Sequence, residues 1–76
     1  MTISLLDAVV LQIDIPQHSL KTGDIGAVVE LYGVDGAEVE FTTGSGKTQA
    51  VLTLKQDQIR RIGDDEILSV RAVNAA

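Results

Sequence analysis

The sequence predicts a small all-β domain. Apolar and polar residues alternate with a period of two in most segments, which is typical of half-buried strands, and helical spacing is nearly absent. Turn residues separate these segments at short intervals, as in a meander of antiparallel strands. The chain has 76 residues, of which 45% are hydrophobic, enough for one domain with a single small core.

The first predicted strand is segment 8–13, AVVLQI, and an irregular arm follows it over 14–24, DIPQHSLKTGD. Pro16 removes a backbone donor from this arm, and Gly23 permits a tight turn. The residues that we expect on one face of the strand are Val9, Leu11 and Ile13.

Three strands are predicted next, over 25–32, 37–42 and 48–54. Asp35-Gly36 indicates a tight hairpin turn between the first two, because both central positions of such a turn have positive φ. Outward positions fall to Glu30, Tyr32, Glu38 and Glu40. We expect the following residues to face inward: Ile25, Ala27, Val29, Leu31, Ala37, Val39, Phe41, Ala50, Leu52 and Leu54.

Segment 55–58, KQDQ, suits one short helical turn, and 59–62 a closing strand. A strand, a long arm, a three-strand meander, a helical turn and a last strand together predict an SH3-like barrel of five to six strands. We assign residues 1–63 to this barrel and 64–76 to a C-terminal extension.

The extension contains EILSVRAV, which places Leu68 and Val70 on one face and other apolar residues on the opposite face. A terminal β segment that is apolar on both sides can pair with another chain. We expect it to form either a sixth strand along the edge of its own barrel or a strand that pairs with a partner or in a homodimer.

GSGKT at 44–48 resembles part of a phosphate-binding loop, whose pattern is G-x-x-x-x-G-K-[ST] between a strand and a helix. The position five before Gly46 is Phe41, and the residues after Thr48 alternate as a strand does. The sequence therefore predicts a glycine-rich hairpin turn here, and no nucleotide cofactor.

No catalytic or metal-binding set is evident. His18 is the only histidine and the chain has no cysteine, whereas a metal site needs three or four converging ligands. The acidic run 64–66 lacks the spacing of a calcium loop, and Glu38 and Glu40 are expected to be exposed. We therefore predict a protein that is not an enzyme and binds no cofactor or metal.

Eleven acidic residues against six basic ones give a net charge of −5. This charge disfavours nucleic acid, which proteins bind largely through Lys and Arg. It serves solubility or attracts a basic protein partner. The first 16 residues have no basic start and Asp7 interrupts their apolar stretch, so we expect no secretion signal or membrane span and a cytoplasmic protein.

Several separated blocks resemble a family of short bacterial proteins of unknown function. Its pattern is L-D-x-V-x-L, then D-x-P-x-x-x-L-x-x-G-x-x-G-x-V-V-E, then E-V-E-F, and finally D-Q-[IL]-R. The blocks that carry the resemblance, within residues 5–62, are LDAV at 6–9, DIPQHSLKTGDIGAVVE at 14–30, EVEF at 38–41, LTL at 52–54 and DQIR at 57–60. The resemblance implies an SH3-like barrel with no known chemistry, and modestly favours partner binding, as in toxin–antitoxin or accessory proteins.

Our leading hypothesis is a non-enzymatic protein-interaction module of the antitoxin, immunity or accessory type that binds a basic protein. The residues that we expect to contact the partner are Tyr32, Glu30, Glu38, Glu40, Leu68 and Val70. The alternative is an RNA- or transcription-associated barrel of the KOW type, suggested by GDIGAVV at 23–29. A nucleotide binder or hydrolase has only the GSGKT string in its favour.

Overall fold

The computed structural model describes residues 3–73, so residues 1–2 of the expected barrel and 74–76 of the expected extension lie outside it. The fold is all-β, as predicted, with five antiparallel strands and two 3-10 turns. The elements are β1 (Ala8–Leu11), η1 (Pro16–His18), β2 (Ile25–Tyr32), β3 (Gly36–Thr42), β4 (Thr48–Lys55), η2 (Gln56–Gln58) and β5 (Ile59–Arg61). None of the described residues forms a helix long and apolar enough to cross a membrane.

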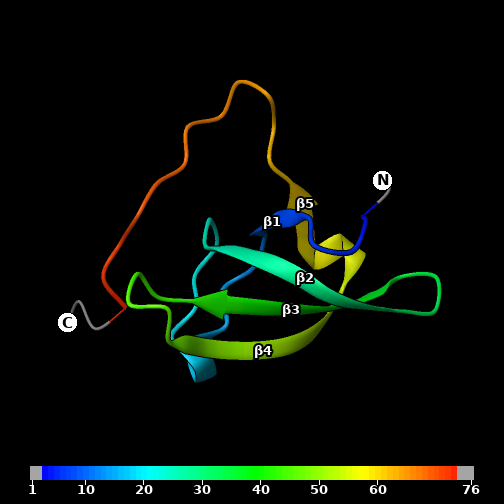
Figure 1. Cartoon of the computed structure of the whole chain (residues 1–76), viewed down its shortest axis with the longest axis horizontal. Coiled ribbons are helices and arrows are strands. Elements are labelled where there is room, and N and C mark those ends of the chain that lie inside the picture. The colour runs from blue at the N-terminus through cyan, green and yellow to red at the C-terminus, as the bar shows by residue number, and fades with distance from the viewer. Residues whose placement is uncertain (1–2, 74–76) are drawn as a thin grey trace.

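All five strands form a single sheet in the order β4-β3-β2-β1-β5 (Figure 1). The two edge strands are β4 and β5, and no pairing between them closes the sheet in the part of the chain that the structure describes. The helical turn predicted near residues 55–58 is η2, which joins these two edge strands.

The core lies on the inner face of the sheet, and most of the residues predicted to face inward contribute to it. The strand predictions hold for β3 and β4, whose inward residues alternate with outward ones as expected. β1 ends at Leu11, two residues before the predicted end, and its residues Val9, Val10 and Leu11 are all buried, so it does not alternate. The buried apolar residues are Ile3, Val9, Val10, Leu11, Leu20, Val28, Ala37, Val39, Phe41, Leu54 and Ile59.

The first half of β2 has the opposite orientation from the one predicted. Gly26 and Val28 are buried, whereas Ile25, Ala27 and Val29 are only half-buried. A β-bulge is the reason: Val28 pairs with Val39, but Glu30 pairs with Glu38, so Val29 is an extra residue in β2. An extra residue shifts the alternation by one, so the predicted outward positions of Glu30 and Tyr32 apply after the bulge. Leu31, which the sequence predicts to face inward, is 37% exposed.

The hairpin between β2 and β3 is present, but its backbone differs from the predicted turn. Its loop is Gly33–Asp35, and Gly33 adopts positive φ (58°). Gly36 lies in β3, where it pairs with Tyr32. A three-residue loop therefore replaces the two-residue turn expected at Asp35-Gly36.

The C-terminal tail, which we define as residues 62–73, forms no strand. The sixth strand expected along the edge of the barrel is therefore absent from the described residues, and pairing with another chain stays a prediction. The tail rises away from β5 and returns beside the β3–β4 hairpin (Figure 1).

Candidate functional site

Three carboxylates and the only tyrosine share the outer face of β2 and β3. We call this the acidic face and define it by Glu30, Tyr32, Glu38 and Glu40. Glu30 and Glu38 are directly opposite each other in the ladder, and the other two members follow at intervals of two residues along their strands. The structure therefore brings together four of the six residues that the sequence predicts for partner binding.

Like charges placed directly opposite on antiparallel strands destabilise a sheet. Glu30 and Glu38 form such a pair, and neither has an ion-pair partner among residues 3–73; the same is true of Glu40. The acidic face thus has a negative charge that the described part of the chain does not compensate.

The arginines are engaged elsewhere. Their ion pairs are Arg60 with Glu66 (2.6 Å), Arg61 with Asp7 (3.8 Å) and Arg71 with Asp24 (2.5 Å). Each of these pairs joins groups away from the acidic face, so the internal pairing leaves the charge of that face in place.

Local hydrogen bonds orient the side chains of the acidic face. The Tyr32 hydroxyl donates to Glu38 Oε1 at 3.4 Å, and the Thr48 hydroxyl donates to Glu40 Oε2 at 2.7 Å. Glu30 Oε1 accepts the backbone N–H of Leu31 at 3.0 Å. Each carboxylate keeps one oxygen without a described hydrogen bond, and this oxygen can accept from a cationic side chain of another molecule.

The surroundings of Tyr32 raise the pKa of its phenol. Desolvation raises the pKa of its phenol, and the charges of Glu38 and Glu30 raise it further. Tyr32 as a whole is 46% exposed. Because the phenol stays neutral, it is a hydrogen-bond donor with an aromatic face, a combination that is enriched at protein interfaces.

Exposed apolar side chains flank the acidic face. Val51 of β4, which lies opposite Glu40, is 47% exposed. Val34, in the loop next to Tyr32, is 95% exposed. A patch that combines apolar area with uncompensated charge is suited to contact another protein.

The GSGKT string lies in the turn between β3 and β4, as the sequence predicts. The N–H of Thr43 donates to the Lys47 carbonyl, and that of Gly46 to the Thr43 carbonyl, both at 2.9 Å. Gly46 adopts positive φ (85°), and Thr48 begins a strand rather than a helix. The N–H groups of Thr43 and Gly46 are thus used within the turn.

His18 ends η1 on the arm and is exposed. Its carbonyl accepts a hydrogen bond from Gln49 Nε2 of β4 at 3.1 Å, so the residue links the arm to the sheet through its backbone. Among residues 3–73, no group of three or more His, Cys, Asp or Glu side chains has the arrangement of a metal site.

The other two predicted contact residues, Leu68 and Val70, lie in the tail and are not part of the acidic face. Leu68 is 63% exposed and Val70 is 98% exposed. Because the tail is not a strand, the two side chains do not form the apolar strand face that the sequence suggested.

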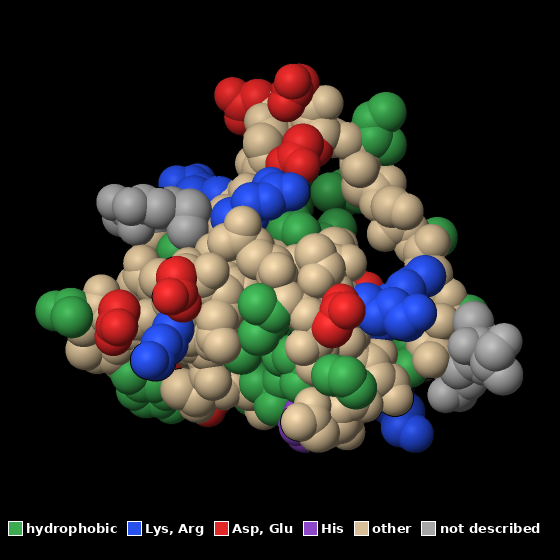
Figure 2. Space-filling model, turned by 180° about the vertical axis from the view of Figure 1, so that it is seen from behind, with side chains coloured by type: hydrophobic (Ala, Val, Ile, Leu, Met, Phe, Trp, Pro, Cys, Tyr) green, Lys and Arg blue, Asp and Glu red, His purple; other side chains and the backbone are tan. Residues whose placement is uncertain are grey.

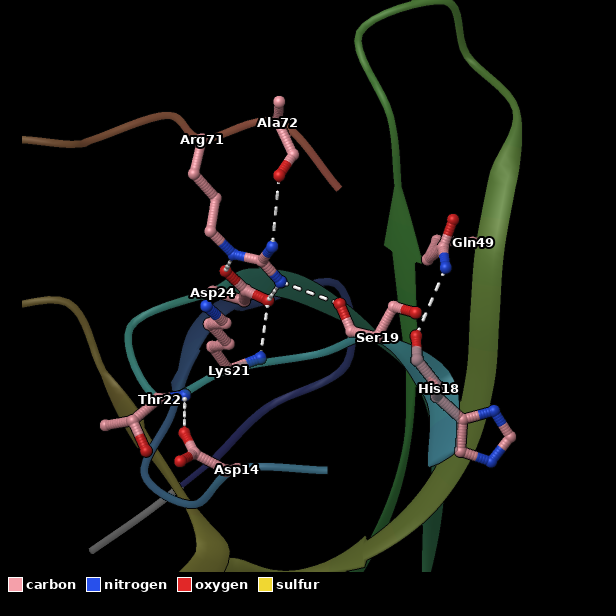
Figure 3. Close-up of polar contacts among 9 residues, drawn as sticks. All are labelled: Asp14, His18, Ser19, Lys21, Thr22, Asp24, Gln49, Arg71 and Ala72. Carbon is pink, nitrogen blue, oxygen red and sulfur yellow. Dashed lines mark hydrogen bonds and ion pairs between the residues drawn. The ribbon is translucent and has the colours of Figure 1, made fainter. Parts of the chain in front are cut away.

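Sequence reasoning missed the residues that fasten the tail. At its start Glu66 accepts two hydrogen bonds from Arg60, and at its end Arg71 binds Asp24 and Ser19 (Figure 3). The second fastening joins residues that are 47 and 52 positions apart in the chain. No local pattern in the sequence signals such a distant contact.

A family model described as a domain of unknown function, DUF4926, matches residues 5–61. No curated protein and no solved structure matches the chain. The matched region extends from the segment before β1 to the end of β5, so it contains the acidic face and excludes the tail.

Proposed function

Since the chain belongs to the DUF4926 family of domains of unknown function, we propose from its own surface that it is a non-enzymatic module that binds a basic protein. The acidic face is the proposed binding surface. An antitoxin, an immunity protein or an accessory subunit would use such a surface to hold a partner rich in Lys and Arg.

The observation that supports this proposal most is the opposed pair Glu30 and Glu38. This pair disfavours folding of the isolated chain, and a cationic side chain from a partner would turn the repulsion into attraction. The neutral phenol of Tyr32, which contacts Glu38, adds a ring on which an Arg or Lys side chain can stack.

We also propose that the sheet is an incompletely closed SH3-like barrel. Its strand order, the long arm after β1 and the η2 turn between β4 and β5 support this assignment. In such a barrel the outer face of β2–β4 is free of covering elements, which leaves it accessible to a partner.

The test is capture of a partner from cells of the source organism at low and moderate ionic strength. We expect the full chain to retain one basic protein in stoichiometric amount, and the triple variant Glu30→Gln/Glu38→Gln/Glu40→Gln to lose it. Retention should fall as salt is added, because the Debye length shortens to about 8 Å at physiological ionic strength.

The matched control is Asp57→Asn/Asp64→Asn/Asp65→Asn, which removes the same number of negative charges from exposed positions outside the acidic face. This control should retain the partner. If both triple variants lose the partner equally, only net charge matters, and if the full chain retains no stoichiometric protein at low salt, the proposal is wrong.

The RNA-associated alternative has one feature in its favour, the glycine turn at Gly23 that leads into β2. Against it, the guanidinium groups of Arg60, Arg61 and Arg71 lie beside carboxylates. A salt-dependent gel shift with RNA, in place of protein capture, would favour this alternative.

A further inference from the structure

The arm between β1 and β2 is held in one shape by two aspartates. Asp14 Oδ1 accepts the backbone N–H of Thr22, and Asp24 Oδ2 accepts that of Lys21, both at 2.8 Å. Ser19 follows η1 with positive φ (56°), and its carbonyl accepts from outside the arm. These contacts place the Asp24 carboxylate and the Ser19 carbonyl side by side, facing one incoming group (Figure 3).

That incoming group is the guanidinium of Arg71. Its Nε donates to Asp24 Oδ1 at 2.8 Å and its Nη2 to Oδ2 at 2.5 Å, which is the paired geometry in which carboxylates bind arginine most strongly. Nη2 also donates to the Ser19 carbonyl at 2.7 Å. We call the acceptor set of Asp24 and Ser19 the arginine socket.

The socket carboxylate is partly shielded from water. The Asp24 side chain is 17% exposed. Burial by itself would raise the pKa of Asp24, but hydrogen bonds from Arg71 and from the Lys21 N–H, together with their charges, lower it below its ordinary value. With Arg71 in place, the carboxylate is therefore ionised at neutral pH.

The tail that supplies Arg71 is otherwise weakly attached. Among the described residues, no backbone–backbone hydrogen bond joins 67–73 to the rest of the chain. Val70, the residue before Arg71, is 98% exposed, Ala72 is exposed and Val73 is half-buried, so the residues near Arg71 add little packing. The side chain of Arg71 is thus the principal attachment of this end of the tail.

Two hollows lie beside the socket, and Arg71 contributes to both. One has a volume of about 390 Å³ and lies over the arm, with Pro16 in its wall. The other measures about 670 Å³ and extends under the tail to Ile25 and Phe41. Figure 2 shows the tail as an arch that stands off the body of the molecule, with hydrophobic side chains beneath it. The tail leaves room for an extended segment around the socket.

From these observations we propose that the arm is a receptor for an arginine in an extended segment of a partner protein, and that Arg71 is an internal mimic of that arginine. The partner's segment displaces the tail and places apolar residues beside Leu20 and Phe41. This inference goes beyond the acidic face: it concerns a different surface and rests on its own contacts, and it shares with the proposed function only the basic character of the partner.

The test measures binding of a blocked, dye-labelled peptide of residues 67–73, ILSVRAV, to the full chain by fluorescence anisotropy. The Arg71→Ala variant, whose socket is vacated, should bind this peptide. The unaltered chain should bind it about tenfold more weakly or worse, because its tethered tail competes at an effective concentration in the millimolar range. A peptide with Gln in place of Arg should not bind.

Two further variants separate the socket from general charge. Asp24→Asn/Arg71→Ala should lose the peptide, whereas Arg61→Ala, which removes an exposed arginine from another ion pair, should behave as the unaltered chain does. Circular dichroism and thermal midpoints of all variants establish that they are folded. If Asp24→Asn/Arg71→Ala is unfolded, the comparison of the Arg and Gln peptides on Arg71→Ala still tests whether the socket binds an arginine side chain.

Equal binding to the unaltered chain and to Arg71→Ala, or no binding to either, would overturn the proposal. So would concentration-dependent dimers of the unaltered chain that Asp24→Asn dissociates, because the socket would then receive the tail of a second copy. The acidic-face triple variant should bind the peptide normally, so failure of the socket and failure of the acidic face are distinguished.

Discussion

At the scale of single residues, Gly26 shows how closely the strands of the core approach one another. It is buried in β2, and its φ is not in the left-handed region. A Cβ at this position would lie 2.6 Å from Val39 Cγ1 and 2.9 Å from Phe41 Cε1. Gly26 is therefore needed for space, because two buried side chains of β3 occupy the volume that a methyl group would take.

We predict that Gly26→Ala lowers the free energy of unfolding by about 1–3 kcal/mol, the usual cost of inserting a methyl group into a packed core. Urea denaturation followed by circular dichroism measures this difference. Gly44→Ala is the matched control, because a Cβ there would meet no atom within 4 Å. Equal stability of the two variants would show that β2 and β3 can move apart without cost.

At the scale of elements, β2 shows what alternation can and cannot predict. The pattern identified the strand and placed Glu30 and Tyr32 outward, as the structure confirms. The pattern assigned the wrong face to the residues in the first half of β2. Residues 25–29 are all apolar or small, so this run fits either face, and the sequence does not show that Val29 is an extra residue. The alternation placed four of the six predicted contact residues on one face correctly, because Glu30 and Tyr32 follow the bulge and Glu38 and Glu40 lie in β3, where the alternation is regular.

The tail shows a second limit of prediction from the sequence. Its composition suggested a strand, yet the structure fastens it through charged side chains, Glu66 at its start and Arg71 at its end. Strand formation needs a neighbouring edge with free backbone groups, and a sequence does not show whether such an edge is in reach. Contacts between distant residues, such as Arg71 and Asp24, are set by the whole fold.

The first fastening of the tail should depend on pH. Hydrogen bonds from the guanidinium of Arg60 and from the Gly63 N–H lower the pKa of Glu66 to about 2. Because this folded-state pKa is below the unfolded value of about 4.3, the stabilisation is fully present above that value and is lost as pH falls towards 2.

The measurement is the amide chemical shift of Gly63, whose N–H donates to Glu66 Oε1 at 2.5 Å. We expect this shift to titrate with a midpoint near 2, as the pKa of Glu66 requires. Arg60→Gln should raise the midpoint towards the ordinary value for glutamate. A midpoint that is already ordinary in the unaltered chain would mean that the Arg60–Glu66 pair does not persist in solution.

At the scale of the whole molecule, the folding unit and the tail are separate in energetic terms. Every buried apolar residue of the described chain lies between Ile3 and Ile59. The tail adds two ion pairs, Arg60–Glu66 and Arg71–Asp24, but no buried apolar side chain among the described residues. The sequence predicts that the compact unit ends at Gly63, and truncation at that residue tests this boundary.

We predict that a chain ending at Gly63 folds and keeps most of the stability of the full chain, because it keeps every buried apolar residue of the described chain and loses only the two ion pairs of the tail. A chain ending at Gln58 also loses β5, which pairs with β1, and the fully buried Ile59. Removing a buried Ile side chain alone costs about 2–5 kcal/mol, so this chain should be largely unfolded. Thermal denaturation of both truncations distinguishes these outcomes. A collapse of the longer one would assign the tail to the core.

The contact between the Tyr32 hydroxyl and Glu38 has a consequence for spectroscopy. With one tyrosine and no tryptophan, the ultraviolet emission of this protein comes almost entirely from that single phenol. A carboxylate that accepts its hydrogen bond quenches the emission, and a cation that draws the carboxylate away restores it. The molecule thus carries its own fluorophore at the surface where we place the partner, and no label has to be attached to watch that surface being occupied.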